Sequence, residues 1–173
     1  EEPCISGNNG SGTIFFSGCN LKCIFCQNIQ ISNQIIGKDI TPEELATICL
    51  NLQKQKANNI NLVTPTPYVP LIIEGIKIAK KKGLNIPIVY NTSGYETIET
   101  IKMLDGIVDI YLPDLKYYND NYAVKYSHIS NYFKYASAVI YEMYKQVGKP
   151  IFNNDGIMVK GIIVRHLMLP GLK

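Results

Sequence analysis

Short apolar runs alternate with helical patterns along this chain, and this alternation restricts the possible folds more than any other feature. Five runs have the length and the β-branched or aromatic content of strands, at 13–17, 61–64, 87–90, 107–112 and 157–169. Helical patterns lie between them, at 41–57, 69–82, 95–104 and 117–147, the last divisible into two pieces. Since strands joined through helices pair in parallel with right-handed crossovers, the chain is expected to form an α/β fold.

The number of strand–helix units favours one parallel architecture over another. Five such units fit a partial (β/α) barrel better than an open doubly wound sheet, although periodicity alone does not separate the two. We find no internal repeat or linker, so 1–173 is expected to be a single domain. The chain begins without Met and ends on Pro170-Gly171 directly after the last strand pattern, which suggests truncation at both ends.

Polar or metal-binding residues follow each predicted strand. In parallel α/β folds the chemistry collects beyond the carboxyl ends of the strands, so these residues are the candidate site. In chain order they lie at 17–19, 64–66, 91–93, 114–116 and 165–166.

Charged residues stand out at two of these strand ends. Arg165 lies within an apolar run, and because an unpaired buried guanidinium is costly, it is expected to have an anionic partner. Asp114 and Lys116 are two residues apart and share a face if the strand continues that far. The alternatives are a structural ion pair for Arg165 and a surface ion pair for Asp114 and Lys116.

Three of the five cysteines, Cys19, Cys23 and Cys26, lie within eight residues directly after the first strand. That spacing does not fit a disulfide framework and indicates a metal site in a reducing compartment. Structural zinc requires four closed ligands, and the candidates for a fourth, Cys4 and Cys49, each lack a CxxC partner. Closed four-cysteine clusters of the ferredoxin type use other spacings. Three thiolates on a four-iron cluster would leave one iron open.

The CxxxCxxC loop, with an aromatic residue before its last cysteine, resembles the signature of the radical S-adenosylmethionine (SAM) superfamily. The likeness covers nearly the whole chain. Segments 91–95 and 111–116 look like the third- and fourth-strand motifs of pyruvate formate-lyase activating enzymes, and 165–171 looks like their fifth strand. The chain is most similar to the branch called pyruvate formate-lyase activating enzyme-like, or PflX-like.

This resemblance implies a six-stranded partial barrel, of which about five strands are present here. It implies a [4Fe-4S] cluster on Cys19, Cys23 and Cys26, with SAM on the open iron. Reductive cleavage of SAM to a 5′-deoxyadenosyl radical would then abstract hydrogen, as in activation of a glycyl-radical enzyme. The implied partners are a one-electron donor such as flavodoxin or ferredoxin and a glycyl-radical protein substrate.

The resemblance also suggests which residues meet SAM. Phe25 suits contact with adenine, or packs the loop, and Asn91 and Ser93 would lie near the ribose and methionine. The charged candidates would lie near the methionine carboxylate or the substrate: Asp114, Lys116 and Arg165. Thr64 begins a Thr-Pro-Thr segment where the family usually has Gly-Gly-Glu, whose backbone meets the SAM amino group. Asn91 replaces the third-strand acid of true activases, and the family's sixth strand is absent.

Composition excludes several other functions. A formal charge of +3 is too small to indicate a nucleic-acid partner, and no stretch reaches the roughly 20 apolar residues that span a bilayer. We expect a cytoplasmic protein with no membrane partner. Two alternatives to the activating enzyme remain: a non-catalytic zinc or iron–sulfur module, and a radical SAM enzyme that modifies RNA.

Overall fold

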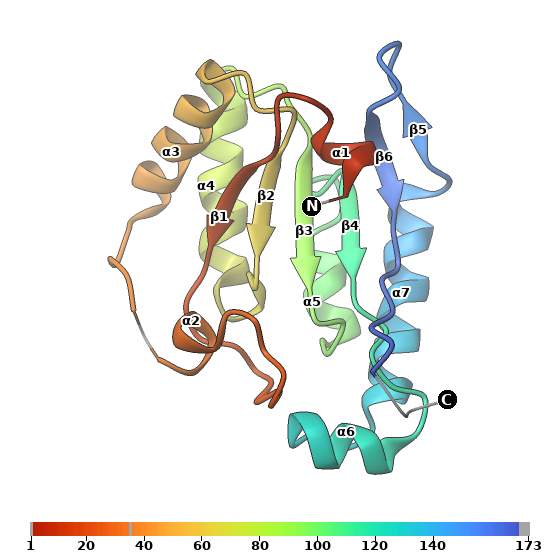
Figure 1. Ribbon diagram of the computed structural model, residues 1–173. Coiled ribbons are helices and arrows are strands. Elements are labelled where there is room, and N and C mark those ends of the chain that lie inside the picture. The colour runs from red at the N-terminus through yellow and green to blue at the C-terminus, as the bar shows by residue number, and fades with distance from the viewer. Residues whose placement is uncertain (1, 35, 170–173) are drawn as a thin grey trace.

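The computed structural model describes residues 2–34 and 36–169, and its centre is a six-stranded sheet (Figure 1). The strand order is β1-β2-β3-β4-β6-β5. Neighbours from β1 through β6 pair in parallel, and β5 pairs antiparallel with β6 at the edge. The strands are β1 (Gly12–Phe15), β2 (Ile60–Val63), β3 (Ile88–Thr92), β4 (Ile110–Pro113), β5 (Ile151–Phe152) and β6 (Met158–Ile162). Five parallel strands in chain order confirm the predicted partial barrel.

Helices cover one face of this sheet, here called the outer face. The outer face is covered by α3 (Pro42–Lys54), α4 (Val69–Lys81), α5 (Ile98–Met103) and α7 (Tyr132–Val147). The remaining helical elements are α1 (Pro3–Ser6), α2 (Ile29–Asn33), the 3-10 turn η1 (Thr66–Tyr68) and α6 (Asp120–Ser127). The main hydrophobic core joins buried residues of α3, α4, α5 and α7 to alternate residues of the strands. The opposite, inner face is covered only in part, by Ile5 of α1 packed against Val89, Ile110 and Leu112.

The helix starts and crossings follow from local sequence. Thr41 caps α3 by accepting from the Glu44 N–H, while the Glu44 carboxylate accepts from the Thr41 N–H, and the two bonds together form a capping box. Helices α3 and α4 approach closely at Gly75, where an added Cβ would lie 2.9 Å from Leu45 Cδ2. A larger residue at this position would separate the two helices.

The prediction of one continuous strand over 157–169 is wrong. Strand β6 ends at Ile162, and the hydrophobic side chains of Val164, Leu167 and Met168 beyond it are exposed. The backbone pairs once more with β4, in a parallel bridge from Arg165 to Asp114. The run has apolar composition, but its side chains beyond Ile162 are exposed or only partly buried, so the composition was misleading. The predicted terminator at 170–171 lies outside the described residues.

Other differences are local. Strand β4 begins at Ile110, three residues later than predicted, because Ile107 and Val108 are buried in the turn after α5. The short helices α1 and α2 and the strand β5 have too few residues to give a periodic signal. The tyrosine-rich segment forms two helices, α6 and α7, as predicted. None of the helices in the described ranges is long and apolar enough to cross a bilayer.

Candidate functional site

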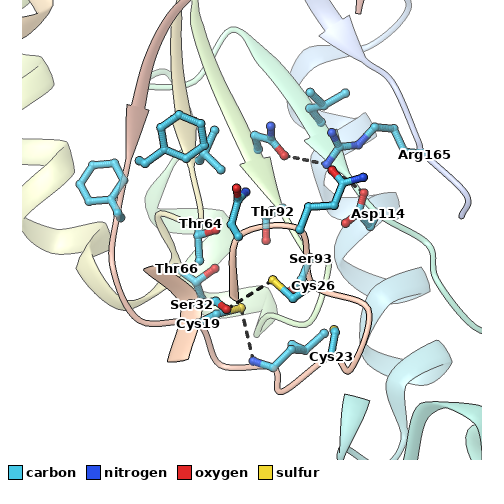
Figure 2. Close-up of a pocket in the computed structure, with 18 of the residues that line it drawn as sticks. Cys19, Cys23, Cys26, Ser32, Thr64, Thr66, Thr92, Ser93, Asp114 and Arg165 are labelled. Atoms are coloured by element: carbon cyan, nitrogen blue, oxygen red, sulfur yellow. Dashed lines mark hydrogen bonds and ion pairs between the residues drawn. The ribbon is translucent and has the colours of Figure 1, made fainter. Parts of the chain in front are cut away.

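A cavity of about 1100 Å³ lies over the inner face of the sheet and its carboxyl ends (Figure 2). All ten residues singled out from the sequence line it: Cys19, Cys23, Phe25, Cys26, Thr64, Asn91, Ser93, Asp114, Lys116 and Arg165. They come from the loops after β1, β2, β3 and β4, from the end of strand β3 itself in the case of Asn91, and from the segment after β6. The parallel topology therefore brings these distant segments together, as expected from the strand order. Their individual roles stay predictions.

The cysteine loop is held between two helices. On one side the Cys19 N–H donates to the carbonyl of Ser32 in α2, at 3.0 Å. On the other side the Lys22 N–H donates to the carbonyl of Ser127, the last residue of α6, at 3.2 Å. Both helices lie beyond the carboxyl ends of the strands (Figure 1). The loop backbone is thus held at Cys19 by α2 and between Cys19 and Cys23 by α6.

Each cysteine sulfur has a hydrogen-bond partner. Cys23 Sγ lies 2.9 Å from Ser127 Oγ, and Cys26 Sγ lies 3.3 Å from Ser32 Oγ. Cys19 Sγ accepts from the backbone N–H two residues later, at 3.4 Å. Burial raises the pKa of the Cys19 and Cys23 thiols above the ordinary value. Metal binding at this loop would therefore release protons.

The donor set is three thiolates, the ligands that proteins supply to iron–sulfur clusters, so the loop fits such a cluster. Over the described ranges, no three His, Cys, Asp or Glu side chains converge as ligands of one metal ion. Cys4, one candidate for a fourth zinc ligand, lies in α1, whose Ile5 carbonyl is bonded to Asn59 just before β2. That helix is near the amino ends of the strands, away from the loop.

A group of three charged residues lies at the cavity's other side. Asp114 pairs with Lys116 through one carboxylate oxygen and with Arg165 Nη2 through the other, at 2.8 Å. Arg165 Nη2 also donates to Asn91 Oδ1 at 2.7 Å (Figure 2). One carboxylate faces two cations, so the group keeps one uncompensated positive charge. The expected anionic partner of Arg165 is thus Asp114, and the residual charge suits an anion in the cavity.

Two sequence expectations about these charges need adjustment. The side chain of Arg165 is 34% exposed rather than buried, since the strand prediction around it was wrong. Its Nε atom is nevertheless buried without a partner. The side chains of Lys116 and Asp114 are only 13% and 20% exposed. The alternative prediction of a surface ion pair is therefore wrong.

Phe25 packs as well as lining the cavity. Its ring makes an edge contact with Tyr117, with centroids 6.5 Å apart, and Lys116 Nζ lies 6.0 Å from its centroid. The packing alternative considered for Phe25 is therefore observed. Contact with adenine stays a prediction.

The turn after β2 is strained. Thr64 has φ of 59°, in the left-handed region that a β-branched residue rarely adopts. Its N–H donates to the carbonyl of Asn91 on the neighbouring strand at 3.0 Å, which holds the turn in place. At the position of Thr64, the family that this chain resembles usually has glycine. The backbone conformation of Thr64 is one that glycine adopts easily.

A buried carboxylate behind this turn was missed in the sequence. Glu96 Oε1 accepts from three hydroxyls: Thr66 at 2.7 Å, Thr92 at 2.6 Å and Tyr90 at 3.0 Å. Its Oε2 is buried without a partner, and burial raises the pKa of Glu96. Since Thr66 and Thr92 line the cavity, Glu96 sets which way their hydroxyls point. A lone Glu at a helix start carries no sequence signal for this role.

Tyr132 of α7, also missed, joins the ends of β3 and β4. Its hydroxyl oxygen lies 2.8 Å from the carbonyl oxygens of both Ser93 and Asp114, which share its single proton, and it accepts from the Lys116 N–H at 2.9 Å. Gly94 permits this approach, since an added Cβ would lie 2.4 Å from the Asp114 carbonyl oxygen. The site residues of two strands are therefore fixed relative to each other.

The fold and the site together define a class of protein: a partial (β/α) barrel with a three-cysteine loop after its first strand, facing a cavity at the carboxyl ends. The model of the radical SAM superfamily matches residues 13–161, and the chain belongs to this superfamily. The predicted family is confirmed. Superfamily members use a [4Fe-4S] cluster and SAM, which are accordingly the cofactors of this protein.

Two curated proteins are similar to this chain in sequence. It is 34% identical over 171 residues to the uncharacterized protein MJ0674 of Methanocaldococcus jannaschii, covering 92% of this chain and 45% of that protein. It is 29% identical over 122 residues to the pyruvate formate-lyase-activating enzyme of Clostridium pasteurianum, covering 68% and 50%. The chain thus spans about half the length of these curated relatives.

A solved structure shares the fold. The crystal structure of HydG, a maturase of the [FeFe]-hydrogenase, aligns with a TM-score of 0.59 and 17% identity, over 78% of this chain and 32% of that one. At this identity the likeness concerns the fold alone.

Proposed function

We propose that this chain is the catalytic core of a radical SAM enzyme of the activating type. In this proposal Cys19, Cys23 and Cys26 bind three irons of the cluster, and the cavity beside them holds SAM. The observation that carries the proposal is that these thiols share one cavity with the polar ends of all the parallel strands.

The cofactors supply the radical chemistry: one-electron cleavage of the SAM sulfonium C–S bond yields methionine and a 5′-deoxyadenosyl radical that abstracts hydrogen from a substrate. The protein binds and orients the cofactors and excludes water from the cavity. The positive group of Asp114, Lys116 and Arg165 attracts the methionine carboxylate. A hydrogen bond from Arg165 holds Asn91 beside this group. Ser93 lies between this group and the cysteine loop (Figure 2), where it can meet the ribose.

The proposed substrate is a glycyl-radical protein, from which the enzyme abstracts a hydrogen atom at a backbone glycine. The proposed electron donor is flavodoxin or ferredoxin. The relative from Clostridium pasteurianum, named for activating pyruvate formate-lyase, supports this substrate class. Thr64 in place of glycine and Asn91 in place of an acid mark differences from the true activases.

The test is anaerobic reconstitution with iron and sulfide, followed by measurement of 5′-deoxyadenosine released from SAM after reduction. Wild type should show the visible absorption of a four-iron cluster, and Cys23→Ala should lose the cluster and release no 5′-deoxyadenosine. Cys4→Ala is the matched control because Cys4 is exposed and outside the cavity, and it should behave as wild type.

Stoichiometric zinc without a cluster after reconstitution would overturn the proposal, as would loss of the metal in Cys4→Ala. Appearance of a glycyl-radical signal in the electron paramagnetic resonance (EPR) spectrum of a co-incubated glycyl-radical protein would identify the substrate class. SAM cleavage without that signal would restrict the proposal to the cofactor chemistry.

A further inference from the structure

Two buried hydroxyls form a line that ends on one sulfur of the cysteine loop. Tyr117 Oη lies 2.7 Å from Ser127 Oγ, and Ser127 Oγ lies 2.9 Å from Cys23 Sγ. Ser127 is fully buried and Tyr117 is 5% exposed, so water does not compete strongly for either hydroxyl. The contact between Ser127 and Cys23 joins the loop to a residue 104 positions later in the chain.

The number of protons determines the direction of this line once Cys23 binds metal. A metal-bound thiolate can only accept a hydrogen bond, so Ser127 must donate to it. Ser127 has a single hydroxyl proton, so its contact with Tyr117 can exist only if Tyr117 donates to Ser127. The line then runs in one direction, from Tyr117 to Ser127 to Cys23, and every proton in it is used.

The backbone keeps this geometry in place. Ser127 is the last residue of α6, and its carbonyl accepts from the Lys22 N–H in the cysteine loop. The Tyr117 ring packs edge-on against Phe25 and against Tyr132, with centroids 6.5 Å and 5.4 Å away. Neither hydroxyl can therefore turn away from the loop without disturbing buried packing.

The other serine at the loop makes a weaker contact. Ser32 Oγ lies 3.3 Å from Cys26 Sγ, but it also donates to the Ile29 carbonyl at 3.3 Å. Its one proton is divided between two acceptors. The proton of Ser127 has only the sulfur to go to, because its other partner is itself a donor.

We propose that Ser127, oriented by Tyr117, is a positioning residue that donates a hydrogen bond to the Cys23 thiolate and thereby raises the reduction potential of the cluster. This rests on the proposed function only in taking Cys23 as a cluster ligand. The reduced cluster carries one more negative charge than the oxidised cluster, so a donor at a ligand sulfur stabilises the reduced form more. The protein thus makes the cluster easier to reduce at this sulfur.

The experiment measures the midpoint potential of the reconstituted cluster by EPR-monitored redox titration, without SAM or substrate. Ser127→Ala should lower the one-electron equilibrium constant for reduction about tenfold, which corresponds to about 59 mV. Tyr117→Phe should lower it less, because the serine keeps its proton but loses the group that orients it. Ser32→Ala should also shift it less than Ser127→Ala.

Ser137→Ala is the matched control, because this serine lies on α7 and bonds to the Phe133 carbonyl rather than to the loop. Its potential should equal that of wild type. A second measurement follows exchangeable deuterons near the reduced cluster by electron–nuclear double resonance. The strongest coupling should disappear in Ser127→Ala and persist in Ser137→Ala.

An unchanged potential in Ser127→Ala, or an equal shift in Ser137→Ala, would overturn the inference. If Ser127→Ala fails to load a cluster, Tyr117→Phe decides, and an unchanged potential there, together with an unchanged deuteron coupling, refutes the line of donors. Failure of the proposed function looks different, because wild type itself would then hold no cluster to titrate.

Discussion

The outer face of the sheet and the face that lines the cavity are built from alternate residues of the same strands. In β2, Ile60 and Leu62 point to the outer face and are fully buried in the core with the helices. Asn61 and Val63, which alternate with them along the strand, line the cavity. In β1 the cavity-lining Phe15 is 52% exposed.

This difference shows where stability and chemistry are separated. Apolar side chains on the outer face remove surface from water, which is the main stabilising contribution to folding. The inner face and the carboxyl edge carry polar groups, an unpartnered Asn61 oxygen and the strained Thr64. Features that cost stability thus gather where a ligand would bind.

Adjacent residues of β2 provide the sharpest test of this comparison. Leu62→Ala should lower the free energy of unfolding by about 3 kcal/mol, since it leaves a cavity in the core. Val63→Ala, on the cavity side, should cost about 1 kcal/mol or less because its side chain is only partly buried. Urea denaturation of both variants measures the difference. Equal losses would mean that the inner face is packed as tightly as the outer one.

Glu96, where the two faces meet at the carboxyl edge, should give the next largest effect. Glu96→Ala should lower the free energy of unfolding by about 2 kcal/mol because the buried hydroxyls of Tyr90 and Thr92 and the partly buried hydroxyl of Thr66 lose their acceptor. Glu96→Gln keeps an oxygen in the same place and should stay within about 1 kcal/mol of wild type at neutral pH. Thermal unfolding of the two variants side by side tests whether acceptor geometry or charge matters more.

The comparison of wild type with Glu96→Gln also gives a pH prediction. Burial raises the pKa of Glu96 in the folded state, so the native protein binds a proton that the unfolded chain has released. The contribution of this group is fully present below the unfolded pKa and is lost as the pH rises through the raised folded pKa. Wild type should therefore lose stability relative to Glu96→Gln above about pH 4.5. A difference that is constant with pH would contradict this.

Thr64 should give the smallest effect, of opposite sign. Thr64→Gly should raise the free energy of unfolding by up to about 1 kcal/mol, since glycine adopts a positive φ without strain. Thr47→Gly, in the middle of α3, is the control and should lower it by about 0.5–1 kcal/mol. Differential scanning calorimetry would show the two melting temperatures moving apart. A loss of stability in Thr64→Gly would mean that the threonine side chain contributes more than its backbone costs.

Sequence patterns predicted the parts of the site that depend on local order. The three cysteines, Asn91 and Asp114 follow strands, and parallel strands end on the same edge, so their meeting at one cavity could be expected. Ser127 and Glu96 could not, because each is a single polar residue in or beside a helix with no periodic pattern around it. Ser127 lies 104 residues after its partner Cys23, and Glu96 lies 30 residues after its partner Thr66.

The amino-acid sequence alone specified the order of strands and helices, the superfamily and the position of the thiols at the end of the first strand, because hydrophobic periodicity and motif spacing are local. Tertiary structure alone decided that β6 stops at Ile162, that Asp114 is shared by Lys116 and Arg165, and that Ser127 and Tyr117 support Cys23. These outcomes depend on which surfaces the helices leave uncovered and on contacts between distant segments. The loop of Cys19, Cys23 and Cys26 is recognisable in sequence, but the groups that surround its sulfurs are set by the packing of α2 and α6.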